Sequence, residues 1–242
     1  MTKKKEWFVS WFDTNYYHTL YKHRDYKEAE NFMQNLVSFL KVKKEAVLLD
    51  LACGKGRHSL YLNTLGYDVT GADLSENSIE FAKQFENDNL HFKVHDMCEP
   101  FNKQFDAVFN LFTSFGYFEH EEDNLNTIKA IKADLNDTGF GVIDFMNIDF
   151  VLENLVLEEV KVVDGITFFL RRYVQDGYLY KDINFSQNGE EHSFQERVKA
   201  FSLSDFESLF EQAGVYLLDI FGDYKLNKFN PATSERLVMI FK

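Results

Sequence analysis

The chain has 242 residues, of which 45% are hydrophobic, enough apolar material for a sizeable core and too much for a disordered chain. Its formal net charge of −13 opposes binding to phosphate backbones and anionic membrane surfaces, so we expect neither nucleic acid nor membrane partners. Cys53 and Cys98 are too few for a disulfide framework, and no apolar stretch suits a signal peptide or membrane span; we expect a cytoplasmic protein without a metal site.

The first part of the chain alternates short apolar runs with helical patterns. Apolar residues at helical spacing over 26–40 predict an N-terminal helix that packs on the core. The runs that follow predict strands at 47–51, 67–73, 90–94, 105–111 and 139–146, with helices ending near 66 and spanning 75–85 and 123–135. Such alternation favours a parallel sheet covered by helices.

The pattern changes after residue 157. Two-residue turn signals at Asp164-Gly165, Asp176-Gly177 and Asn188-Gly189 are spaced evenly, which predicts an antiparallel meander over 158–201. Ser204 and Glu207 then have the spacing of a capping box, and Gly214 stands where a helix would end. Strands at 215–221 and 236–241 complete the chain as an antiparallel pair.

The clearest motif joins Asp50, at the end of the first strand, to a glycine-rich turn at 52–56 and to Asp73, at the end of the second strand. Gly54 and Gly56 allow close approach of the backbone to a ligand at the start of a helix. An acid at Asp73 can accept hydrogen bonds from both hydroxyls of a ribose.

The same turn nearly matches the glycine fingerprint of NAD-binding enzymes, with Ser59 where glycine or alanine is expected. Asp50 separates the two ligands, because a carboxylate beside the turn would repel a pyrophosphate but tolerates the ammonium and sulfonium groups of S-adenosylmethionine. The residues therefore favour S-adenosylmethionine as the cofactor.

These motifs resemble those of the class I S-adenosylmethionine-dependent methyltransferases, over roughly residues 45–146 and 203–242. The resemblance implies an α/β fold with a Rossmann-like, seven-stranded and mostly parallel sheet, into which an antiparallel β-subdomain is inserted after strand five. We expect a helical cover at 1–44, a cofactor-binding domain at 45–157 and 203–242, and the inserted subdomain at 158–202. Ala52 departs from the family's glycine and fits only if its φ is not positive.

The resemblance also implies the residues of the site. Asp96 and Met97 follow the third strand and are expected at the adenine, and Asn110 ends the strand beside the transferred methyl group. An N-terminal cover would bring Arg24 to the cofactor carboxylate, although aromatic packing and a solvated arginine remain the alternative. The full set expected to bind the cofactor is Tyr17, Arg24, Asp50, Ala52, Cys53, Gly54, Gly56, Asp73, Leu74, Asp96, Met97 and Asn110.

Methyl transfer is an in-line displacement that needs no special catalytic group, although a base helps when the acceptor is protonated. Tyr117 and His120 follow the fourth strand and are the candidates for that base, whereas His58 is expected to be structural. The region after Asn110 lacks the motifs by which the family methylates adenine, glutamine or cytosine. With the acidic composition and the added β-subdomain, the resemblance to the family favours a small-molecule acceptor.

Three functional hypotheses remain open at this point: a small-molecule methyltransferase, an NAD-dependent oxidoreductase, and a non-catalytic S-adenosylmethionine-binding interaction protein. The inserted meander is expected to cover the acceptor side of the pocket, or else to form a dimer interface. We accordingly expect a monomer or a homodimer.

Overall fold

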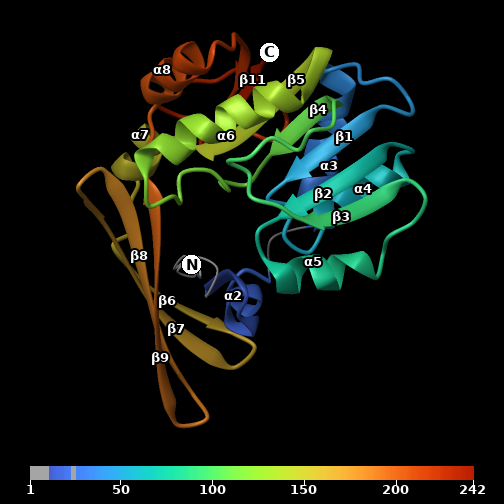
Figure 1. Ribbon diagram of the computed structural model, residues 1–242. Helices are drawn as coiled ribbons and strands as arrows, with labels where there is room; N and C mark the ends of the chain where they lie inside the picture. The colour runs from blue at the N-terminus through green and yellow to red at the C-terminus, as the bar shows by residue number, and fades with distance from the viewer. Residues whose placement is uncertain (1–10, 23–25) are drawn as a thin grey trace.

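The structure is a computed structural model that describes residues 11–22 and 26–242. Seven strands form one sheet in the order β10-β11-β5-β4-β1-β2-β3, in which β11 runs antiparallel to its neighbours β10 and β5 and the other pairs are parallel (Figure 1). The expected Rossmann-like α/β sheet is therefore confirmed. Its strands are β1 (Val47–Leu51), β2 (Asp68–Asp73), β3 (Leu90–Val94), β4 (Phe105–Asn110), β5 (Leu135–Met146), β10 (Leu217–Phe221) and β11 (Arg236–Phe241).

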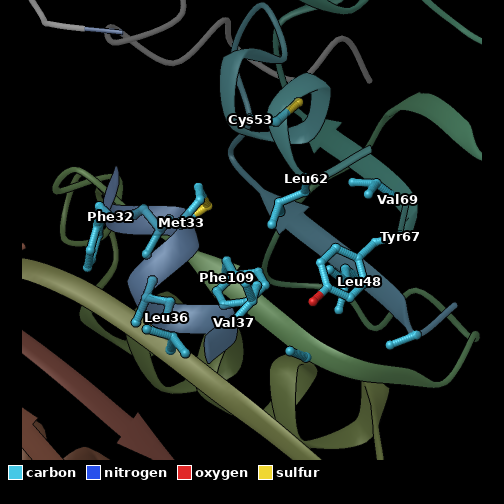
Figure 2. Packing of buried hydrophobic residues seen from close by; sticks show 14 of the residues in the cluster. Phe32, Met33, Leu36, Val37, Leu48, Cys53, Leu62, Tyr67, Val69 and Phe109 are labelled. Carbon is cyan, nitrogen blue, oxygen red and sulfur yellow. The ribbon is translucent and has the colours of Figure 1, made fainter. Parts of the chain in front are cut away.

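Helices cover both faces of this sheet, because its central strands are apolar on both sides. Neighbouring residues such as Leu48 and Leu49 point to opposite faces and enter separate core clusters. On one face, Phe32 and Leu36 of α3 belong to the same core cluster as Leu48 and Phe109, part of which Figure 2 shows. The helices are α3 (Tyr26–Phe39), α4 (Arg57–Thr64), α5 (Glu76–Lys83), α6 (Glu121–Asp134) and α8 (Leu203–Ala213).

Four antiparallel strands form a second sheet in the order β6-β7-β8-β9. The strands are β6 (Glu158–Val163), β7 (Ile166–Gln175), β8 (Tyr178–Gln187) and β9 (Glu190–Lys199). Both residues of each connecting Asp-Gly or Asn-Gly turn have positive φ, the conformation that two-residue hairpins need and that these residue types tolerate. The meander expected from the turn spacing is confirmed.

A short N-terminal segment, residues 11–22 with helix α2 (Asn15–Leu20), lies between the two sheets (Figure 1). Trp11 and Leu20 are each 1% exposed and pack with Phe168 and Phe185 on the inner face of the four-stranded sheet. Toward the other sheet, the hydroxyl of Ser75 donates a hydrogen bond to Asp13. The segment thus joins the inserted sheet to the end of β2.

Several element boundaries differ from expectation. β5 begins at Leu135 rather than 139, across an irregular register with β4; β10 begins at Leu217; and the short helix α7 (Ile148–Glu153) was not expected. The expected capping box at Ser204 and Glu207 was wrong. The box is formed by Ser202 and Asp205, because the helix already begins at Leu203 and Ser204 lies inside its first turn.

No helix within residues 11–22 and 26–242 has the length and apolar character needed to cross a membrane.

Candidate functional site

The loop after β1 carries three residues with positive φ. Gly56 (φ 83°) caps α4, and an added Cβ would lie 2.5 Å from the Phe92 ring, so glycine is required there. Ala52 was expected to fit only if its φ is not positive. Its φ is 62°, so that condition is not met. The left-handed conformation costs a non-glycine residue about 1–2 kcal/mol. The loop therefore holds Ala52 in a strained conformation beside Gly54 (φ 55°).

Asp73 ties this loop to the end of β2. Its two carboxylate oxygens accept backbone hydrogen bonds from Gly54 and Ser75, both at 2.8 Å. Burial raises the pKa of Asp73, the two hydrogen bonds oppose that rise, and the nearby carboxylate of Asp13 adds to it. No sequence motif pointed to Asp13, which reaches this point only because residues 11–22 pack against the inserted sheet.

Asp50 is 1% exposed, and one of its oxygens accepts a hydrogen bond from the Ser59 hydroxyl at 2.6 Å. Burial raises the pKa of Asp50 to about 6. The residue that departs from the glycine fingerprint, Ser59, is therefore the partner of Asp50 and secures the start of α4. The protein encloses Asp50 at this position, so its carboxylate supports the loop from within.

The side chains after β3 and β4 lie at the same edge of the sheet. Asn110 is fully buried; its amide nitrogen donates to the Leu51 carbonyl at 3.1 Å and lies 3.7 Å from the Met97 sulfur. Its amide oxygen has no hydrogen-bond partner among the described residues. Asp96 accepts from the backbone N–H of Cys98, and Leu74 is 38% exposed beside Asp73.

A cavity of about 370 Å³ lies between this edge and the four-stranded sheet, a size within the usual range for small-molecule sites. It is lined by Glu28, Phe112, Thr113, Tyr117, Met146, Arg172, Leu179, Lys181, Glu196, Val198, Tyr224 and Arg236. The structure thus brings Tyr117 into the cavity wall. His120 is exposed at the N-cap of α6 and is not among the described residues of this lining.

The structure describes only one of the two residues expected in the N-terminal cover, Tyr17. Tyr17 lies on α2, with ring contacts to Trp11 and Phe12. Phe12 in turn contacts the ring of Tyr117, which lines the cavity, so Tyr17 lies one residue away from the cavity wall. Arg24 lies outside the described residues.

A strained turn follows β4 and forms part of the cavity wall. Phe112 (φ 56°) and Thr113 (φ 59°) are both left-handed, which is unusual for bulky and β-branched residues. The buried Asp144 accepts the Phe112 N–H at 2.8 Å, and Arg236 binds both Asp144 and the Thr113 hydroxyl at 2.9 Å. No local sequence pattern indicates this arrangement, because Thr113, Asp144 and Arg236 come from three distant segments of the chain.

Phe112 also joins the cavity wall to the helix that follows the glycine-rich loop. The ring of His58 stacks on it with centroids 4.9 Å apart, and the Arg57 guanidinium lies 4.9 Å from its centroid. His58 is mostly buried, with its Nδ1 4.0 Å from Asp50. These positions give His58 a packing role between Asp50 and Phe112.

Neither cysteine is activated. Burial raises the pKa of the Cys53 thiol well above its usual range and that of Cys98 to about 12, so both thiols stay protonated near neutral pH. Across residues 11–22 and 26–242, no group of three or more His, Cys, Asp or Glu side chains is arranged to hold a metal ion.

Comparison with known proteins identifies the family. The model of the tellurite resistance protein TehB matches residues 11–143, more than half of the chain. The chain belongs to the TehB family. This agrees with the resemblance to class I S-adenosylmethionine-dependent methyltransferases drawn from the motifs, and the NAD-dependent oxidoreductase hypothesis is set aside.

Two curated relatives align over just under half of the chain. The probable S-adenosyl-L-methionine-dependent methyltransferase TehB of Haemophilus influenzae is 38% identical over 45% of this chain and 39% of its own length. The glycine/sarcosine N-methyltransferase of Aphanothece halophytica is 32% identical over 48% of this chain and 47% of its own. The chain therefore spans less than half the length of these curated relatives.

A solved structure extends the likeness in fold to the whole chain. The S-adenosylmethionine-dependent methyltransferase of Clostridium acetobutylicum superposes with a TM-score of 0.79 and 20% identity, covering 97% of each chain. The inserted four-stranded sheet is thus included in the shared fold.

Proposed function

We propose that this chain binds S-adenosylmethionine and transfers its methyl group to a small-molecule acceptor held in the cavity. The amide oxygen of Asn110 is the observation that carries the proposal. Its amide nitrogen is committed to the Leu51 carbonyl, so the buried oxygen is left without a partner among the described residues. A buried acceptor of this kind calls for a donor, and the ammonium group of the cofactor would supply one.

The remaining edge residues fit the other parts of the cofactor. Each oxygen of Asp73 accepts one backbone N–H and retains a lone pair for a ribose hydroxyl. Leu74 and Met97 offer apolar surface to the adenine, and Asp96 offers an acceptor for its amino group. The backbone at 52–54 can approach the methionine part, while Asp50 supports that loop through Ser59.

When bound there, S-adenosylmethionine would supply a methyl group attached to a positively charged sulfur. The nucleophile would attack the methyl carbon in line with the carbon–sulfur bond, and the sulfur would leave as a neutral thioether. The chain's own contribution is to hold that nucleophile close and aligned, an effect worth several orders of magnitude in rate. Tyr117 is the candidate base because it lines the cavity. We do not assign that role to His120, which is exposed outside the wall. Tyr17, on α2, would help to cover the cofactor.

Titration calorimetry with S-adenosylmethionine, S-adenosylhomocysteine and NADH tests the proposal. We expect micromolar or tighter binding of the first two ligands and none comparable of NADH. Asp73→Ala should weaken cofactor binding by about 2–4 kcal/mol, because two hydroxyls lose a charged acceptor. Asp68→Ala, at the opposite end of the same strand, is the matched control and should leave affinity unchanged.

Binding of NADH without S-adenosylmethionine, or unchanged affinity in a folded Asp73→Ala variant, would refute this assignment. Turnover to S-adenosylhomocysteine with an acceptor separates an enzyme from a non-catalytic binder. We propose that the protein acts without nucleic acid as a monomer or a homodimer, and sedimentation of the purified chain distinguishes the two.

A further inference from the structure

The inner face of the four-stranded sheet carries a row of charged side chains across three strands. Arg172 of β7 pairs directly with Lys181 of β8, which pairs in turn with Glu196 of β9. All three side chains line the cavity. Further along the same face the inward side chains, such as Phe168 and Ile183, are apolar and fully buried, so the charged row is confined to the part of the sheet that borders the cavity.

Two cations directly opposite one another in a sheet destabilise it unless negative charge compensates them. Arg172 donates through Nη2 to Glu159 at 2.6 Å and through Nη1 to the Val156 carbonyl. Both of these partners lie on the β6 side of Arg172, away from Lys181. This ion pair secures the guanidinium, and the charge of Glu159 acts on Lys181 as well.

The acid on the other side of Lys181 is already heavily hydrogen-bonded. Glu196 accepts from the Trp11 indole N–H and from the Tyr21 hydroxyl, each at 2.7 Å. The Lys181 ammonium is 3.7 Å from Glu196 and donates to the same Tyr21 hydroxyl at 2.6 Å. Residues 11–22 thus hold both ends of this contact, and Lys181 is fixed at the cavity wall.

The balance of charge in the cavity is the reverse of that in the whole chain. Its lining contains three cationic side chains, with Arg236 on the opposite wall, and two acidic ones, Glu28 and Glu196. The chain as a whole has 26 Lys and Arg against 39 Asp and Glu. Each of the three cations has an acidic partner: Glu159 for Arg172, Glu196 for Lys181 and Asp144 for Arg236. Glu159 and Asp144 lie outside the lining, so the surface that faces the cavity presents more cationic than acidic side chains, which favours a ligand that brings negative charge.

We propose that the cavity recognises an acceptor through an anionic group, a carboxylate or a phosphate, bound between Arg172 and Lys181. A guanidinium and an ammonium side by side suit the several oxygens of either group. The apolar side chains of Leu179 and Val198 border the same row and contact the body of the acceptor. This proposal deepens the methyl-transfer function proposed above, and it rests on that function for identifying the bound molecule as the methyl acceptor.

The test uses probes matched in shape and different in charge. Benzoate, phenyl phosphate, neutral benzamide and cationic benzylamine are titrated into the protein saturated with S-adenosylhomocysteine, with binding followed by ligand-observed NMR. We expect benzoate or phenyl phosphate to bind at least tenfold more tightly than benzamide, and the stronger of the two identifies the class of anion. Raising the chloride concentration should reduce this preference.

Arg172→Gln and Lys181→Gln should each abolish the preference for the anionic probe, whereas Lys181→Arg should keep most of it. Arg171→Gln removes the same charge from the opposite, exposed face of the same strand and should leave the preference intact. Circular dichroism and thermal melting confirm that each variant is folded, and the Lys181→Arg result remains informative if a glutamine variant does not fold.

Equal binding of benzoate, phenyl phosphate and benzamide, tighter binding of benzylamine, or no binding of any probe would overturn the proposal. So would an anion preference that survives in both glutamine variants, or one that Arg171→Gln also removes. Failure of S-adenosylhomocysteine to bind would count against the proposed function instead. The anion preference would then be measured without that ligand, which keeps the two conclusions separate.

Discussion

Ala52, Phe112 and Thr113 all adopt positive φ without being glycine, and all three lie at the strand edge where the site is built. Residues in such conformations persist only where the surroundings impose them. At Thr113 two contacts hold the backbone in this conformation. The Asp144 backbone carbonyl accepts the Thr113 N–H, and the Arg236 guanidinium donates to the Thr113 hydroxyl. Positive φ at these three residues thus gives the loop after β1 and the cavity wall a defined shape, although other non-glycine residues with positive φ, such as Lys41 and Asn102, lie elsewhere in the fold.

Replacing Ala52 with glycine should stabilise the protein by about 1 kcal/mol, because glycine has no Cβ to oppose the left-handed conformation. Urea unfolding measures the change. Ala133→Gly, on the exposed side of α6, is the control. This variant should lower the free energy of unfolding by a similar amount, because glycine is a poorer helix former than alanine. A destabilised Ala52→Gly variant would show that the methyl group contributes more by packing than it costs in strain.

The stability contributed by Asp50 should depend on pH. Burial raises its pKa to about 6, above the usual value for an unfolded chain, so the folded state binds the proton more tightly. The contribution is complete below the unfolded pKa and is lost as pH rises through about 6. The difference of about two pKa units corresponds to about 3 kcal/mol.

Unfolding free energies of the wild type and Asp50→Asn, measured from pH 4.5 to pH 7.5, check this expectation. The wild type should lose stability relative to the variant as pH rises. Asp134, whose pKa burial also raises to about 6, is present in both proteins and cancels in the comparison. Parallel curves for the two proteins would contradict the assignment of a raised pKa to Asp50.

At the scale of elements, the inserted sheet and the segment at 11–22 act together. The segment buries Trp11 and Leu20 against β7 and β8, and it meets the end of β2 through Asp13 and Ser75. The four-stranded sheet reaches back to the main fold where the Lys199 N–H donates to the Gly116 carbonyl at 2.8 Å. These contacts enclose the cavity between the two sheets.

Replacing residues 158–201 with a short Gly/Ser linker should leave cofactor affinity within about tenfold, equivalent to about 1.4 kcal/mol. Transfer to the natural acceptor should be abolished, because the wall carrying Arg172 and Lys181 is removed. Calorimetry and turnover assays measure the two effects. Full turnover in a folded, shortened protein would contradict a role for the sheet in acceptor selection.

The same shortened protein also tests the alternative of a dimer interface. Val160, Val162 and Phe169 are each more than half exposed on the outer face of the sheet. A change from dimer to monomer, with turnover retained, would favour the interface. Sedimentation equilibrium supplies that measurement.

At the scale of the whole molecule, the net charge of −13 governs long-range encounters. Binding to a duplex requires cations that replace the counterions on phosphates, and the cations of this chain are outnumbered overall. The cationic side chains at the cavity lie between two sheets, around a space of about 370 Å³ that is too small for a duplex.

We therefore expect no appreciable affinity for duplex DNA or transfer RNA at physiological salt. A gel-shift assay over a range of salt concentrations checks this. Submicromolar binding that weakens with salt would contradict the expectation and would indicate a basic surface outside the cavity.

The amino-acid sequence alone determined the features that depend on neighbouring residues. The alternating apolar runs indicated the parallel sheet, the Asp-Gly and Asn-Gly pairs indicated the meander, and the turn at 52–56 with Asp73 indicated the class of cofactor. Each of these signals is local, because strand periodicity, turn conformation and loop composition act within a few residues.

Only the tertiary structure decided how the acceptor cavity is built. Asp144 and Arg236 hold Thr113, and Asp13 reaches Ser75. These contacts join segments that lie up to 123 positions apart in the chain, and no local pattern encodes such a pairing. The residues that meet in the cavity are set by the register of two sheets and by the segment packed between them, and register follows from the burial of whole strand faces.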